Sequence, residues 1–304
     1  MSNMVVNTNI LALNSHRNLS KVGIAQQKAS SRLSSGLRVN SAADDAAGLA
    51  ISEKMRAQIR GLDMATKNTQ DGISMIQTAE GGLQEIENMA QRIRELTVQA
   101  ANDSNEQEDR KKIGAEVRQL LDEIQDMAKR TEFNKKKILS GKYASSAPGG
   151  VTKLYLQVGA NDKQLISFKI GALTTTGLSA AITSGGAGVF PGFSAGMHFS
   201  KIDSAINTGA ATLISKFVAV AEAAITLVTD ERAKLGAVQN RLEYTMNNLK
   251  ISSENLSASE SRIRDTDMAK EMMNLTRANI LQQASTSMLA QANQAPQSVL
   301  QLLQ

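Results

Sequence analysis

The chain lacks cysteine and tryptophan, and among its 304 residues only three are proline and only 3% are aromatic. Without cysteine there are no disulfides, no thiolate metal sites and no cysteine nucleophile. Its two histidines, His16 and His198, leave no histidine cluster for a metal. Scarce proline permits long uninterrupted helices, and scarce aromatic residues disfavour a bulky core. These absences favour a long-helix interaction protein over an enzyme, and we expect neither a cofactor nor a metal.

The lengths of the apolar runs and the distribution of charge bear on whether the chain contacts a membrane or a nucleic acid. No apolar run approaches the roughly 18 residues that suggest a membrane span, and the N-terminus shows no basic-then-apolar signal peptide. The net charge of +5 is unevenly placed: residues 1–43 hold no acid, and after Glu271 the only charged residue is Arg277. No phosphate-binding glycine loop is present, and the basic run 135–137 lacks aromatic neighbours. We therefore expect no membrane and no nucleic-acid partner.

Two long segments carry apolar residues in a 3-4 repeat. The first covers residues 44–100, behind a helix cap at Asn40 or Ser41, and the second covers residues 203–263. At 1.5 Å per residue these helices would extend roughly 85 Å and roughly 90 Å. Matching lengths favour an antiparallel coiled-coil rod built from both halves of the chain. A shorter helix is expected to follow the first one, behind a second cap at Asn105.

The middle of the chain has a different composition. Residues 144–200 contain two of the three prolines and many glycines, which is typical of turns. Apolar and polar residues alternate at 155–159 and 164–170, which predicts a β-hairpin. Residues 131–141 predict a second short β-turn element. The predicted fold class is therefore mainly α, with a small β-hairpin region in the middle.

The segments 5–35 and 268–303 repeat the helical pattern as narrow apolar stripes diluted by Gln, Ser and Asn. Such stripes do not offset roughly 1–2 kcal/mol per residue of backbone ordering. We predict that both ends are disordered in the free monomer and fold when they pair with each other and with neighbouring copies. The alternative is that they pack onto the rod as an ordinary bundle. The candidate polymerisation residues on these stripes are Leu19, Val22, Leu33, Leu275, Leu289, Val299 and Leu303.

Several long motifs, in the correct order, resemble the signatures of bacterial flagellins. Near the N-terminus these are LSSGLRVNSAADDAAGLAI at 33–51 and NTQDGIS at 68–74. Near the C-terminus they are RAKLGAVQNRL at 232–242, SRIRDTDMA at 261–269 and LAQANQAPQ at 289–297. The resemblance covers about residues 1–143 and 230–304.

This resemblance implies a structural subunit that self-assembles into the helical flagellar filament for motility. Such a subunit is exported unfolded and polymerised at the filament tip, outside the cell and without a cleaved signal peptide. The implied domains are a terminal inner-tube domain (1–43 and 265–304), a helical rod (44–143 and 201–264) and a short surface-facing segment (144–200). The implied partners are further copies of the chain, the filament cap and hook-junction proteins, and a cytosolic export chaperone on the C-terminal segment.

Other family properties transfer by position alone. Gln91, Arg92 and Leu96, with Glu116 downstream, resemble the region that the animal Toll-like receptor for flagellin binds; the alternative is plain rod surface or a subunit contact. The family's N-terminal pattern fits a start at Met4 better than one at Met1. The competing interpretations of the whole chain are a hook-filament junction protein of the same family and a signalling coiled-coil hairpin. No constellation of catalytic residues supports an enzyme.

Overall fold

The computed structural model of the chain describes residues 9–141, 153–171, 174, 202–208 and 211–301. It divides into two compact units, one formed by Met1–Ile59 with Ser253–Gln304 and the other by Arg60–Ser252. Each unit therefore combines segments from both halves of the chain. The finer domain boundaries expected at 43/44 and 264/265 stay a prediction.

Helices dominate the described residues. In chain order they are α1 (Ile10–Ser35), α2 (Ala46–Ala100), α3 (Gln107–Arg130), α5 (Ile202–Thr208), α6 (Ala211–Arg264) and α7 (Met268–Gln301). Two antiparallel strand pairs lie between α3 and α5 in the sequence: β1 (Glu132–Phe133) with β2 (Lys136–Lys137), and β3 (Leu154–Gln157) with β4 (Leu165–Phe168). The mainly α fold class with a small β-hairpin region is thus confirmed.

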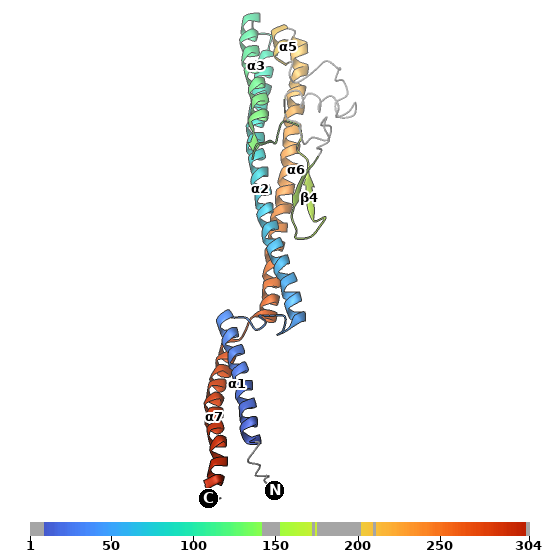
Figure 1. Ribbon diagram of the computed structural model, residues 1–304. Helices are drawn as coiled ribbons and strands as arrows, with labels where there is room; N and C mark the ends of the chain where they lie inside the picture. The colour runs from blue at the N-terminus through green and yellow to red at the C-terminus, as the bar shows by residue number, and fades with distance from the viewer. Residues whose placement is uncertain (1–8, 142–152, 172–173, 175–201, 209–210, 302–304) are drawn as a thin grey trace. The chain divides into compact units, whose positions relative to one another are not determined.

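In the first unit, α1 and α7 lie side by side in antiparallel directions (Figure 1). The side-chain amide of Asn9 donates a hydrogen bond to the carbonyl of Ala292 at 2.7 Å, and Gln26 donates to Asn279 at 2.8 Å. Residue numbers therefore rise along α1 as they fall along α7. The two ends of the chain supply each other with a packing partner.

Defined caps limit α1 at both ends. The Asn9 side chain accepts a hydrogen bond from the backbone N–H of Ala12 at 3.0 Å, as an N-cap residue does. Gly36 follows the helix with φ of 71°, and its N–H donates to the carbonyl of Arg32 at 2.8 Å. This left-handed conformation suits glycine because it has no Cβ. The Gly36 carbonyl then accepts from the N–H of Thr266 at 3.0 Å, which joins the segment after α1 to the segment before α7.

The core of the second unit follows the predicted apolar repeats. On α2 the buried residues of the repeat are Ala65, Thr69, Gly72, Ile76, Ala79, Leu83, Ile86, Ala90, Ile93, Thr97 and Ala100. On α6 the buried repeat residues in this unit are Phe217, Val220, Ala224, Leu235, Leu242 and Leu249. An ion pair between Arg232 of α6 and Glu87 of α2, at 2.5 Å, crosses the same contact. The 3-4 repeat therefore marks the packing surface between these helices.

Both predicted β elements are present. In β3 and β4, Leu154 pairs with Phe168 and Gln157 pairs with Leu165, close to the expected hairpin limits. In the shorter pair, Asn134 and Lys135 form the turn with φ of 48° and 63°. Two successive positive φ values are the signature of a type I′ hairpin turn, whose twist matches that of the flanking strands.

The β3–β4 hairpin rests on α2 where α2 carries glycine. A Cβ added at Gly61 would lie 2.7 Å from the Cβ of Ala160, and one added at Gly72 would lie 2.5 Å from a methyl group of Leu156. The side chain of Asn68 donates to the carbonyl of Gln157 at 3.2 Å. Because Gly61 and Gly72 have no side chains, Ala160 and Leu156 of the hairpin segment can lie close to α2.

Three helix boundaries differ from the sequence prediction. The cap of α2 is Asp45, not Asn40 or Ser41: its carboxylate accepts from the N–H of Gly48 at 2.8 Å, three residues ahead. Likewise Asn105 does not cap α3. Its amide donates instead to a carbonyl in the last turn of α2, and Glu106 is the N-cap residue, without a side-chain cap bond.

The long helix expected over 203–263 is divided into α5 and α6. α5 ends at Thr208 and α6 begins at Ala211, and residues 209–210 lie outside the described residues.

Candidate functional site

The predicted polymerisation stripes lie where α1 and α7 contact each other. Five of the named side chains are half-buried: Leu19, Val22, Leu33, Leu275 and Leu289. The small stripe residues Ala29 and Ala278 are buried, and both line a cavity of ≈290 Å³ together with Val22. Val299 belongs to α7, but its side chain lies outside the described residues, as does all of Leu303. Within one copy, each stripe is thus occupied by the other terminal helix.

A different set of apolar side chains on the same helices faces solvent. It comprises Ile10, Leu11, Leu13 and Ile24 of α1, and Met268, Met272, Met273, Ile280, Leu281 and Met288 of α7. We call this set the outer apolar face. Its members are between 46% and 65% exposed, and four of them, Met272, Met273, Ile280 and Leu281, border one surface hollow. Exposed apolar side chains that cluster in this way mark interaction surfaces. The sequence analysis missed this face, although the spacing of Met268, Met272 and Ile280 on one side of α7 was a signal for it.

Charged side chains connect the C-terminal end of α1 to both neighbouring segments of the first unit. The Lys28 ammonium lies 2.6 Å from the carboxylate of Asp44, and Arg32 lies 3.7 Å from Glu271 of α7. The hydrogen bond from Lys28, with backbone N–H donors such as that of Ser41, lowers the pKa of Asp44 from its ordinary 3.8 to about 2. The ionised form of Asp44 therefore holds α1 against the turn that precedes α2.

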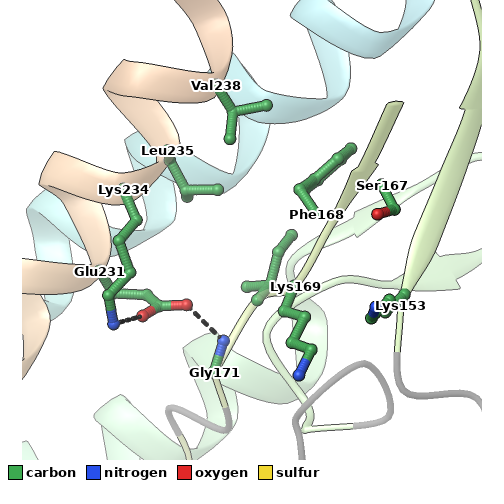
Figure 2. A pocket seen from close by; sticks show the side chains of 10 residues that line it. Lys153, Ser167, Phe168, Lys169, Gly171, Glu231, Lys234, Leu235 and Val238 are labelled. Carbon is green, nitrogen blue, oxygen red and sulfur yellow. Dashed lines mark hydrogen bonds and ion pairs between the residues drawn. The ribbon is translucent and has the colours of Figure 1, made fainter. Parts of the chain in front are cut away.

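A cavity of ≈620 Å³ lies between the end of β4 and α6 (Figure 2). Glu231 accepts a hydrogen bond from the N–H of Gly171 at 2.7 Å and pairs with Lys234 at 3.0 Å. Phe168 and Leu235 supply apolar walls. Glu231 is the only acid among the described residues that line the cavity, and both of these interactions use its carboxylate. The arrangement attaches the chain after the hairpin to α6 and offers no pair of groups for acid–base chemistry.

Comparison with known proteins accounts for this architecture. Residues 6–144 match the bacterial flagellin N-terminal helical region, and residues 218–303 match the bacterial flagellin C-terminal helical region. Flagellin of Bacillus subtilis is 51% identical over 305 residues, a match that covers 99% of this chain and 100% of the relative. The chain belongs to the bacterial flagellin family.

Another relative matches along the full length, and a solved structure matches part of the chain. The flagellar filament 33 kDa core protein of Treponema phagedenis is 44% identical, with 99% of this chain and 100% of the relative covered. The crystal structure of Bacillus cereus flagellin is 25% identical and covers 60% of this chain and 88% of that chain, with a TM-score of 0.45. Family membership confirms the expectation of a structural subunit of the flagellar filament, and nothing favours the junction-protein or signalling alternatives.

The candidate receptor-recognition residues do not share one environment. Gln91, Arg92 and Glu116 are exposed, and Arg92 lies 3.0 Å from Glu116 of α3 and 3.1 Å from Glu95. These acids raise the pKa of Arg92 above its ordinary value, so it stays charged. Leu96 is only 2% exposed and belongs to the core. The surface on this part of α2 is therefore a charged cluster, and Leu96 packs in the core beneath it.

Within the ranges that the structure describes, no group of three or more His, Cys, Asp or Glu side chains is arranged to hold a metal ion. In the same ranges, no helix combines the length and the apolar character needed to cross a membrane. The expectations that the chain binds no cofactor and has no enzymatic activity stay predictions.

Proposed function

We propose that this filament subunit polymerises through its two terminal helices, α1 and α7, which form the inner tube of the filament. The observation that carries the proposal is the outer apolar face, which stays exposed after α1 and α7 have paired with each other. Burial of apolar surface is favourable by about 25 cal/mol for each Å² removed from water, and side chains left in water do not gain this free energy. Contact with neighbouring copies removes that cost.

The geometry of the contact fits an open assembly. A filament needs a heterologous contact, in which one surface meets a different surface of the next copy without closing into a ring. The α1–α7 pair offers two chemically distinct surfaces, because α1 contributes Ile and Leu whereas α7 contributes mainly Met. We assign the rod role to residues 44–143 and 201–264, and the outward-facing role to residues 144–200.

Family membership supports a proposal for the route to the filament. We propose that the chain is exported unfolded and added outside the cell at the filament tip, where it meets the cap. The subunits at the base of the filament meet the hook-junction proteins. A chain without cysteine forms no disulfides before threading through a narrow channel. Before export, a cytosolic chaperone covers the nearly uncharged segment after Glu271, whose exposed methionines and aliphatic residues would otherwise associate.

Recognition by the animal Toll-like receptor for flagellin is proposed for the exposed cluster on α2 and α3. Its support is the exposure of Gln91, Arg92 and Glu116, because an arginine that forms ion pairs at a surface is also a suitable anchor for a protein partner. Receptor-reporter cells treated with Arg92→Ala protein test the assignment. An unchanged response relative to the parent chain removes it.

Polymerisation is tested with a charge placed in the stripe. Leu289→Asp introduces a carboxylate at the half-buried contact of α7 with α1, whereas Leu289→Met conserves apolar volume and serves as the matched control. Seeded growth of purified protein is followed by light scattering and electron microscopy, and hydrogen exchange reports the helices of the second unit. We expect Leu289→Asp to keep those helices but to stop growth, and Leu289→Met to grow normally. Leu303→Asp is expected to behave as Leu289→Asp does, and normal filaments from either Asp variant contradict the assigned role.

A further inference from the structure

We propose that the exposed methionines of α7 form an oxidation-sensitive site that decides whether a free subunit can join the filament. The inference rests on the proposed function, because it takes the outer apolar face as the surface that meets neighbouring copies. Met268, Met272, Met273 and Met288 are 48%, 52%, 65% and 55% exposed. Each thioether is therefore open to a small oxidant while the subunit is free.

These methionines supply much of the apolar surface of a nearly uncharged helix. Four of the 13 methionines of the chain lie exposed on α7, whose only charged residues are Lys270, Glu271 and Arg277. Met272 and Met273 border a surface hollow of ≈510 Å³ together with Ile280 and Leu281. Methionine suits such a surface because its unbranched, polarizable side chain adapts to the shape of a partner. The same choice makes the surface chemically vulnerable.

The chemistry needs only a peroxide as oxidant. The thioether sulfur attacks one oxygen of hydrogen peroxide, the O–O bond breaks, a sulfur–oxygen bond forms, and the departing hydroxide takes the remaining proton to leave as water. The sulfur loses two electrons and the peroxide gains them. The product, methionine sulfoxide, is polar and chiral where the thioether was apolar. Docking would then bury a sulfoxide oxygen without a hydrogen-bond partner, which opposes association.

Two other methionines provide internal references. Met64 lies on α2 in the second unit and is 55% exposed, as Met288 is, but it does not belong to the outer apolar face. Met75 of α2 is only 6% exposed and should resist the same treatment. Once a subunit has docked, its α7 methionines are covered, so the site acts on subunits before incorporation. Methionine sulfoxide reductases, supplied with a dithiol that is oxidised to a disulfide, return the thioether, release the oxygen as water and make the block reversible.

The experiment treats the full chain with hydrogen peroxide, removes the oxidant, and measures elongation on unoxidised filament seeds. Peptide mass mapping reports which methionines carry oxygen. We expect sulfoxide at the four α7 positions and at Met64, an elongation rate reduced at least about tenfold, and recovery after incubation with reductases of both stereospecificities. In finished filaments the α7 methionines should be less oxidised than in the free subunit.

Two variants separate the site from general damage. The chain carrying Met268→Leu, Met272→Leu, Met273→Leu and Met288→Leu should elongate at the same rate before and after peroxide, because leucine keeps the apolar volume without an oxidisable sulfur. The matched control, Met64→Leu, should stay as sensitive as the parent chain.

Several results overturn the proposal. One is normal elongation by protein that carries sulfoxide at all four α7 positions, and another is equal sensitivity of the four-leucine variant and the parent. If the four-leucine variant fails to elongate without peroxide, the reductase experiment on the parent chain decides, and absence of recovery overturns the site. Failure of the proposed function shows itself differently: untreated protein that carries Ile280→Asp, a charge on the outer apolar face, then grows normally.

Discussion

The seat of the β3–β4 hairpin on α2 predicts that two glycines on the same helix respond in opposite ways to the same substitution. Gly61→Ala places a methyl group 2.7 Å from the Cβ and 3.3 Å from the Cα of Ala160. Carbon atoms in proteins pack at about 3.5–4.0 Å, so the hairpin must move. Gly81→Ala meets nothing within 4 Å. It is the matched control, on the same helix with the same added group.

The magnitudes follow from two opposing effects. Replacing glycine by alanine inside a helix stabilises it by about 1 kcal/mol at either position. At Gly61 the added methyl also overpacks the contact with Ala160, which costs about 1–3 kcal/mol. A methyl group added at Gly61 would meet the Cβ and Cα of Ala160, which cannot rotate away, whereas one added at Gly72 would meet the flexible end of Leu156. We expect Gly81→Ala to stabilise the protein and Gly61→Ala to be about 1–3 kcal/mol less stable than Gly81→Ala.

Thermal unfolding followed by circular dichroism measures this difference, since each kcal/mol shifts the midpoint by about 2–4 °C in a unit of this size. Hydrogen exchange supplies a local readout: amides of 154–157 and 165–168 should lose protection in Gly61→Ala and keep it in Gly81→Ala. Equal stabilisation by both alanines, with hairpin protection unchanged, would refute the close approach of the hairpin to α2.

Three further predictions concern single side chains. The pKa of Asp44 is about 2 in the folded chain against an ordinary 3.8, so its stabilising effect is complete above pH 4 and is lost as pH falls toward 2. Asp44→Asn should flatten this part of the pH–stability curve measured by circular dichroism. An unchanged curve contradicts the assignment. Glu231→Ala should cost about 1–3 kcal/mol and speed exchange of the Gly171 amide, whereas Glu231→Gln, which keeps an acceptor, should do less; equal effects would speak against this bond. Leu96→Ala should lower the free energy of unfolding in urea by about 2–5 kcal/mol. Arg92→Ala should change it by no more than about 0.5 kcal/mol. A Leu96→Ala chain as stable as the parent would show that this leucine does not belong to the core.

Much of the fold was predictable because burial on a helix repeats with a fixed period. From Ala65 to Ala100, every position that the 3-4 repeat selects on α2 is buried, and Ile73, Met75 and Leu96 are buried outside the repeat. Helix starts were less predictable, since Asn40, Ser41, Asp44 and Asp45 are all suitable cap residues. Tertiary contacts make the choice: Asp44 is held by Lys28 of α1, which leaves Asp45 to cap α2.

The candidate site was only half predictable for a related reason. The stripe that includes Leu19 and Leu289 is a periodic pattern, and the structure places it at the contact between α1 and α7. The outer apolar face is equally apolar, but the side of a helix that remains exposed depends on where its partner lies. Leu96 differs from the exposed residues of the motif that resembles a receptor site, because it lies in the core beneath them. Disorder of the ends in the free monomer stays a prediction.

Because α1 pairs with α7, the packing of the first unit needs both ends of the same chain. The hydrogen bond from Asn9 to Ala292 joins residues separated by 283 positions, almost the whole chain. Closing so long a loop adds little entropy cost beyond that of a shorter one, but it requires that the last segment has been synthesised and delivered. A product of premature termination would leave the apolar stripe of α1 without its partner from the same chain.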